Sequence, residues 1–141
     1  MAARVERAMA AARQRPEEQD LLLDSAALNL HDFYGGLERA FHQIAAMVDG
    51  SMPSGREWHR ELLRQMGIAV SQVRPAALSG ETVQLLDEYL RFRHVVRNIY
   101  AFSFDADRLE RLSQRLRPCL GQVGAELLAF ADFLERVGQE D

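Results

Sequence analysis

The chain has 141 residues, of which 48% are hydrophobic and 27% charged, and this is the size and composition of one ordinary globular domain. The formal net charge of -4 disfavours a protein coated in positive charge for gripping duplex nucleic acid, although it is compatible with a local basic site. The single cysteine, Cys119, excludes an internal disulfide, and no apolar run reaches the roughly 18 residues of a membrane span. We therefore expect a cytoplasmic protein without a membrane partner.

The predicted elements are helical, because apolar residues recur every three or four positions and no segment alternates for long. The first helix is predicted over residues 3–15 and is broken at Pro16. The second is predicted over residues 17–49, where one buried stripe follows the helical period. On this basis residues 1–16 form an N-terminal helical extension, and residues 17–137 form a single helical bundle domain.

The third helix is predicted to begin with a capping box, Ser54-Gly55-Arg56-Glu57, in which Ser54 is the N-cap and Glu57 the reciprocal partner. It is expected to run to about residue 70 and to be followed by a loop over residues 72–79. The fourth helix is predicted over residues 80–102, and the fifth from Asp105, which can cap it, to about residue 137. Long amphipathic helices with short connections predict an all-α antiparallel bundle of four to five helices.

The fourth predicted helix has an unusual polar face. At about 100° per residue, five polar side chains fall on the side opposite the apolar stripe: Arg93, His94, Arg97, Asn98 and Tyr100. No carboxylate lies in the segment 91–100, whereas exposed helices usually interleave acidic residues with arginines. All 17 basic residues of the chain are arginines, and each is a planar, permanently charged fork.

Two explanations of this face stay open. Arginines one turn apart repel unless an anion lies between them, and a phosphate suits that place because a guanidinium binds it in bidentate fashion. The alternative is that Asp87, Glu88 or a carboxylate of another helix pairs with the arginines, which would then form only salt bridges in a plain interaction module.

The segment also resembles the HEPN motif, in which an arginine is followed by a polar residue, three more residues and a histidine, often with a tyrosine two positions further on. Arg93, His94 and Tyr100 take the arginine, polar and tyrosine positions, and Asn98 stands where the histidine is expected. The flanking strings LHDFYGGLERAF at 30–41 and SGREWHRELL at 54–63 look like the HepT-like subgroup. The resemblance covers about residues 21–134.

This resemblance implies a HEPN-like bundle that dimerises so that two motif helices face a shared cleft. It implies a metal-independent endoribonuclease without a cofactor, which cleaves RNA as the toxin of a toxin–antitoxin pair. The antitoxin is then a small nucleotidyltransferase, which in some pairs attaches AMP to the motif tyrosine, here Tyr100. The implied catalytic residues are Arg93, His94 and Asn98, and the phosphate-binding residues are Arg91 and Arg97.

Asn98 leaves the activity open, because an amide does not transfer protons at neutral pH. His94 could take over, since imidazole exchanges protons in that range. The alternative is a catalytically inactive adaptor that binds RNA, nucleotide or the transferase partner. The remaining histidines, His31, His42 and His59, are scattered without the spacing of a metal site, so no metal role is expected for them.

Overall fold

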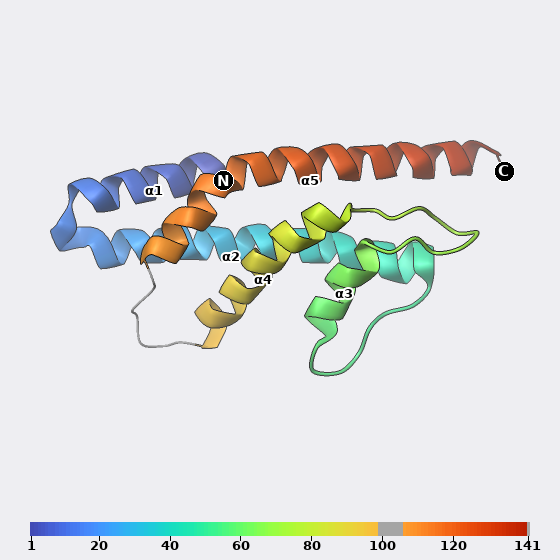
Figure 1. Ribbon diagram of the computed structural model, residues 1–141, viewed down its shortest axis with the longest axis horizontal. Coiled ribbons are helices and arrows are strands. Elements are labelled where there is room, and N and C mark those ends of the chain that lie inside the picture. The colour runs from blue at the N-terminus through green and yellow to red at the C-terminus, as the bar shows by residue number, and fades with distance from the viewer. Residues whose placement is uncertain (99–105, 141) are drawn as a thin grey trace.

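The computed structural model describes residues 1–98 and 106–140 and is drawn in Figure 1. The described residues form five α-helices, namely α1 (Ala2–Gln14), α2 (Gln19–Gln43), α3 (Trp58–Met66), α4 (Gly80–Asn98) and α5 (Ala106–Glu140). A 3-10 turn, η1 (Pro16–Glu18), precedes α2, and a π-helical turn, η2 (Ile44–Asp49), follows it. The same residues contain no strand beyond an isolated bridge between Val70 and Arg74, so the all-α prediction is confirmed.

Helix α2 is the central helix of the bundle and packs against α1, α3, α4 and α5 (Figure 1). Each helix contributes to one core, as shown by the fully buried side chains Val5, Tyr34, Leu62, Leu86 and Leu116. Cys119 is part of this core, and burial raises the pKa of its thiol to about 11. The core therefore includes α1 together with the helices that follow it.

Helix α5 changes direction part-way along its length (Figure 1). Pro118 lies inside the helix, where its ring displaces one backbone hydrogen bond and crowds the preceding turn. The bend gives the two halves of α5 different neighbours. The first half reaches α4 near Arg108, and the second half places Phe130 under the guanidinium of Arg74 at 5.9 Å.

The predicted bounds of the third helix are wrong. Helix α3 begins at Trp58, and Glu57 precedes it without any side-chain capping bond, so the predicted capping box does not form. Gly55 has a φ of 108°, a conformation open to glycine, and it turns the chain just before the helix. The helix ends at Met66 because the loop returns, and the amides of Ala77 and Leu78 donate to the Met66 carbonyl at 2.9 and 3.0 Å.

The capping serine belongs instead to α4. The hydroxyl of Ser79 accepts a hydrogen bond from the amide of Thr82 at 3.2 Å, as an N-cap residue does. Glu126 of α5 completes the cap by accepting bonds from the Ser79 amide and the Thr82 hydroxyl. Burial raises the pKa of Glu126, but these hydrogen bonds outweigh it and the pKa lies below its ordinary value. Helix α5 therefore fixes the start of α4, the helix that carries the segment 91–100.

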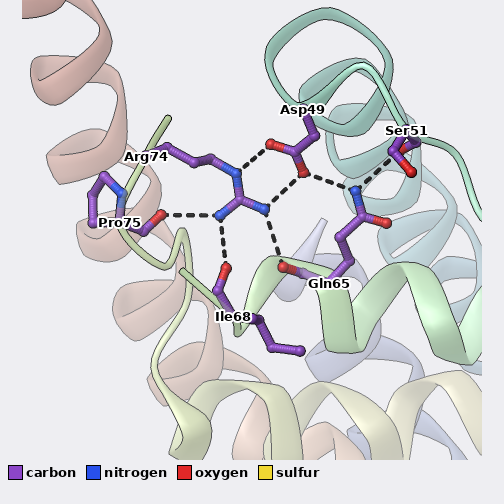
Figure 2. A network of polar contacts seen from close by, with 6 residues as sticks. All are labelled: Asp49, Ser51, Gln65, Ile68, Arg74 and Pro75. Carbon is purple, nitrogen blue, oxygen red and sulfur yellow. Dashed lines mark hydrogen bonds and ion pairs between the residues drawn. The ribbon is translucent and has the colours of Figure 1, made fainter. Parts of the chain in front are cut away.

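The loop between α3 and α4 is anchored by a buried ion pair, shown in Figure 2. The Arg74 side chain is 0% exposed, and it donates to the two Asp49 carboxylate oxygens at 2.6 and 2.8 Å. Its remaining donors reach the carbonyls of Ile68, Pro75 and Gln65 at 2.9–3.1 Å. Every N–H group of this guanidinium therefore has an acceptor, and the loop is tied to the end of η2.

Candidate functional site

A pocket of about 430 Å³ lies where α3, α4 and the start of α5 meet. Its lining contains five arginines and two histidines against one carboxylate: Arg56, Glu57, His59, Arg60, Leu90, Arg91, Arg93, His94 and Arg108. We call it the arginine pocket. Although the whole chain is acidic, this concave surface concentrates positive charge, which favours an anionic ligand.

A second pocket of about 390 Å³ adjoins the first, since Arg91 and Arg108 line both. It adds Arg111 and Arg115 of α5, with Glu88 of α4 as its carboxylate. The two pockets together extend the basic surface along α4 and α5. An extended anion can therefore contact guanidinium groups at successive points.

The structure brings three of the predicted site residues together. Arg91, Arg93 and His94 all line the arginine pocket. Arg97 and Asn98 belong to the last turn of α4, but their side chains lie outside the described part of the structure. Tyr100 lies outside the described residues altogether.

Carboxylates do pair with several of these arginines, as the salt-bridge explanation expected. Arg91 lies 2.5 Å from Asp87, one turn earlier on α4, and Arg60 lies 3.9 Å from the same carboxylate. Arg108 lies over the ring of Phe92 at 5.9 Å. Arg56 forms no ion pair with the side chains described in residues 1–94 and 106–139. Salt bridges therefore neutralise part of the pocket and leave part of its charge available.

Glu38 of α2 does not line the arginine pocket itself but contacts two of its lining residues, Arg93 and His59. It is 7% exposed, and its two carboxylate oxygens bind two different helices. One oxygen accepts a hydrogen bond from the Arg93 guanidinium at 2.8 Å, and the other lies 2.6 Å from Nδ1 of His59. The ring of Trp58 stacks on His59 with centroids 3.5 Å apart. The imidazole is consequently held by a carboxylate and by an aromatic face.

Sequence analysis missed both Glu38 and His59 as site residues. The available signal was the position of Glu38 on the buried stripe of α2, four residues after Tyr34 and three before Phe41. A carboxylate on a buried face needs partners, because burying an unpaired charge is costly. Those partners come from α3 and α4, which no local pattern indicates.

Arg93 is only partly satisfied. Its Nε atom is buried and has no hydrogen-bond partner in the described part of the chain, and its guanidinium lies 5.9 Å from the centre of the Tyr34 ring. The Tyr34 hydroxyl has no partner among the same residues, and burial raises the pKa of this phenol. The arginine at the start of the motif thus retains donor capacity that the protein does not use.

Two further properties bear on the chemistry. No group of three or more His, Cys, Asp or Glu side chains in the described ranges is arranged to hold a metal ion. No described helix has both the length and the apolar character needed to cross a bilayer. What the pocket does offer is guanidinium groups, which bind phosphate oxygens, and imidazoles, which transfer protons.

A family model described as HepT-like protein matches residues 25–134, a span that includes all of α3 and α4 and the whole lining of the arginine pocket. Neither a curated protein nor a solved structure matches the chain.

Proposed function

Because the chain belongs to the HepT-like protein family, we propose that it is a metal-independent endoribonuclease and the toxin of a toxin–antitoxin pair. The observation that carries this proposal is the arginine pocket, in which five guanidinium groups and two imidazoles line one cavity. RNA cleavage without metal requires that the 2′-hydroxyl lose its proton, that the phosphorane charge be balanced and that the leaving oxygen be protonated. These two side-chain types meet those needs.

The proposal gives each site residue a role. Arg93 and Arg91 bind the scissile or a neighbouring phosphate in the pocket, and Arg97 extends this binding along α4. His94 transfers a proton, and Asn98 hydrogen-bonds a phosphate oxygen or a base edge. RNA runs on from the first pocket into the second, where Arg111 and Arg115 contact further phosphates.

Cleavage of a labelled RNA in the presence of EDTA tests the proposal. The wild type is expected to cleave, Arg93→Ala to abolish cleavage and His94→Ala to reduce it strongly. His42→Ala is the matched control, because His42 is exposed on α2 and lines neither pocket. Activity that appears only after addition of a divalent metal would contradict the proposal.

Asn98 supports a second candidate, an inactive adaptor that retains RNA or partner binding, since an amide replaces the proton-transferring group expected there. The same assay separates the two functions. If the wild-type protein binds RNA but does not cleave it, the protein is the adaptor.

The proposal extends to two partners. A second copy of the chain is expected to bring two motif helices together, and light scattering on the purified protein measures the resulting dimer.

A nucleotidyltransferase is expected to attach AMP to Tyr100, which would place a permanent negative charge beside the phosphate-binding arginines and block substrate. Intact mass spectrometry after incubation with such a transferase and ATP should show an AMP-sized increment that Tyr100→Phe removes. An increment that survives this substitution refutes the site.

A further inference from the structure

We propose that His59, oriented by Glu38, is the general base of the cleavage reaction and supplies the proton transfer that Asn98 does not. The inference rests on the proposed function and adds a catalytic residue to it. The structure describes all four histidines of the chain, and they differ in whether they line a pocket. His59 and His94 line the arginine pocket, whereas His31 and His42 line neither pocket.

The contact with Glu38 sets the tautomer of the neutral imidazole. Nδ1 lies 2.6 Å from a carboxylate oxygen, which can only accept, so Nδ1 carries the proton of the neutral ring and Nε2 carries the free electron pair. Among the side chains that the structure describes, in residues 1–94 and 106–139, none is hydrogen-bonded to Nε2. A carboxylate that holds one imidazole nitrogen while the other faces substrate is a general arrangement for a catalytic base.

The surroundings of Glu38 make it a positioning residue. Its second oxygen is bound by Arg93 at 2.8 Å, so the carboxylate is held from both sides and its charge is shared. Trp58 covers one face of the His59 ring and limits its rotation. The His59 side chain nevertheless keeps 24% of its surface exposed, which leaves it open to a ligand in the pocket.

Position in the pocket supplies the second argument. Arg56 and Arg60 flank His59 in the sequence and line the same pocket, and Arg93 is joined to it through Glu38. A phosphate bound by these guanidinium groups brings the neighbouring ribose close to His59. The second histidine of the pocket, His94, comes from α4 on another wall.

The proposed step balances with these two imidazoles. Nε2 of His59 takes the proton of the ribose 2′-hydroxyl, and the 2′ oxygen forms a bond to phosphorus. The bond between phosphorus and the 5′ oxygen breaks, and its electron pair leaves on that oxygen, which receives a proton from protonated His94. The products are a 2′,3′-cyclic phosphate and a 5′-hydroxyl, and solvent then restores both imidazoles.

His59 could instead be a structural link between α2 and α3, so the test must keep that link. His59→Asn does so, because the asparagine amide can donate to Glu38 from the place of Nδ1 and lacks any counterpart of Nε2. We expect its cleavage rate in EDTA to fall by about 10²-fold or more, with RNA affinity and unfolding midpoint unchanged. His42→Asn is the control and should cleave like the wild type.

Chemical rescue adds a readout that a structural role would not move. Added imidazole should restore part of the cleavage by His59→Ala, and the product ends should remain 2′,3′-cyclic phosphate. Glu38→Gln should lower kcat more than it raises KM, because it disturbs the orientation of the base, and added imidazole should not rescue it.

The outcomes separate this inference from the proposed function. If the wild type cleaves RNA and His59→Asn cleaves at the same rate, the role of His59 is refuted while the nuclease assignment stands. If His59→Asn loses folding or RNA binding in proportion to cleavage, His59 is structural and the inference is again refuted. If the wild type cleaves no RNA, both proposals fall together.

Discussion

Two arginines of this protein, the buried Arg74 and the partly buried Arg93, each bind a carboxylate of α2 or of the η2 turn that follows it, yet their donors are used to very different degrees. Arg74 donates to both Asp49 oxygens and to three backbone carbonyls, so its donors are all used. Arg93 donates to Glu38, while its buried Nε atom has no partner among the residues that the structure describes. The first arginine closes a loop, and the second lies in the wall of a pocket.

This difference indicates what each arginine is for. A buried polar group without a partner costs about 1–3 kcal/mol, so a guanidinium whose only task is stability is expected to be satisfied as fully as Arg74 is. Arg93 retains an unmet donor at the place where Arg91 and His94 also line the cavity. A buried group left in this state needs an explanation, and a role in a catalytic or binding site is one.

We call the Arg74–Asp49 network the closed site and the surroundings of Arg93 the open site. The largest expected effect on stability comes from breaking the closed site. Arg74→Met should reduce the free energy of unfolding by about 3–5 kcal/mol, because Asp49 then remains buried without its counter-charge. Urea denaturation followed by circular dichroism measures this. Replacing the partner as well, with Asp49→Leu, should recover much of the loss. A change below about 1 kcal/mol in Arg74→Met would show that the network contributes little.

The open site should respond in the opposite way. Arg93→Lys keeps the charge beside Glu38 but removes the planar fork, so RNA cleavage should fall by about 10²- to 10³-fold. Unfolding free energy should change by about 1 kcal/mol or less. Steady-state cleavage rates and urea midpoints on the same preparation test both halves. Equal losses of stability in Arg93→Lys and Arg74→Met would erase the distinction between the two sites.

Acid should weaken the closed site. Hydrogen bonds from Arg74 hold the pKa of Asp49 below its ordinary value of 3.8, although burial acts in the other direction and Gln65 adds a further bond. The stabilisation from this group is therefore complete above that value and is lost as the pH falls below 3.8 toward the folded-state pKa. Urea midpoints at about pH 5 and about pH 3 should show this loss in the wild type. The double variant Arg74→Met with Asp49→Leu should lack that component.

The smallest effect is expected at an exposed pair. Arg115 lies 3.0 Å from Glu88, and both side chains are about half exposed, at 53% and 46%. Arg115→Ala should change the unfolding free energy by less than about 1 kcal/mol, because solvent screens such pairs. The salt dependence of RNA binding should fall slightly, since Arg115 lines the second pocket. If Arg115→Ala leaves the salt dependence of RNA binding unchanged, RNA does not contact Arg115 in the second pocket.

Sequence periodicity predicted the helices well where each one packs by a continuous stripe, as α2 and α4 do. It failed at α3, whose ends are set by the turn at Gly55 and by loop amides that bind Met66. Arg93 and His94 were found from their shared helix face, because that arrangement is local, whereas Arg91 was named only through the resemblance to the HEPN motif. Arg74, Glu38 and His59 depend on partners from other elements, and their pairing became apparent only in three dimensions.

The π-helical turn η2 also constrains the length of the chain. The wider turn ends where the backbone amides of Gly50 and Ser51 donate hydrogen bonds to the Ala45 carbonyl. This winding sets the direction in which the Asp49 side chain leaves the helix. Removing one residue would restore tighter winding and rotate Asp49 by about 100° away from Arg74. Ala46 and Met47 are exposed, so substitutions of their side chains should be tolerated, yet deletion of either residue would break the buried ion pair. Insertions and deletions in this turn are therefore constrained by its winding, whereas side-chain changes at its surface are not.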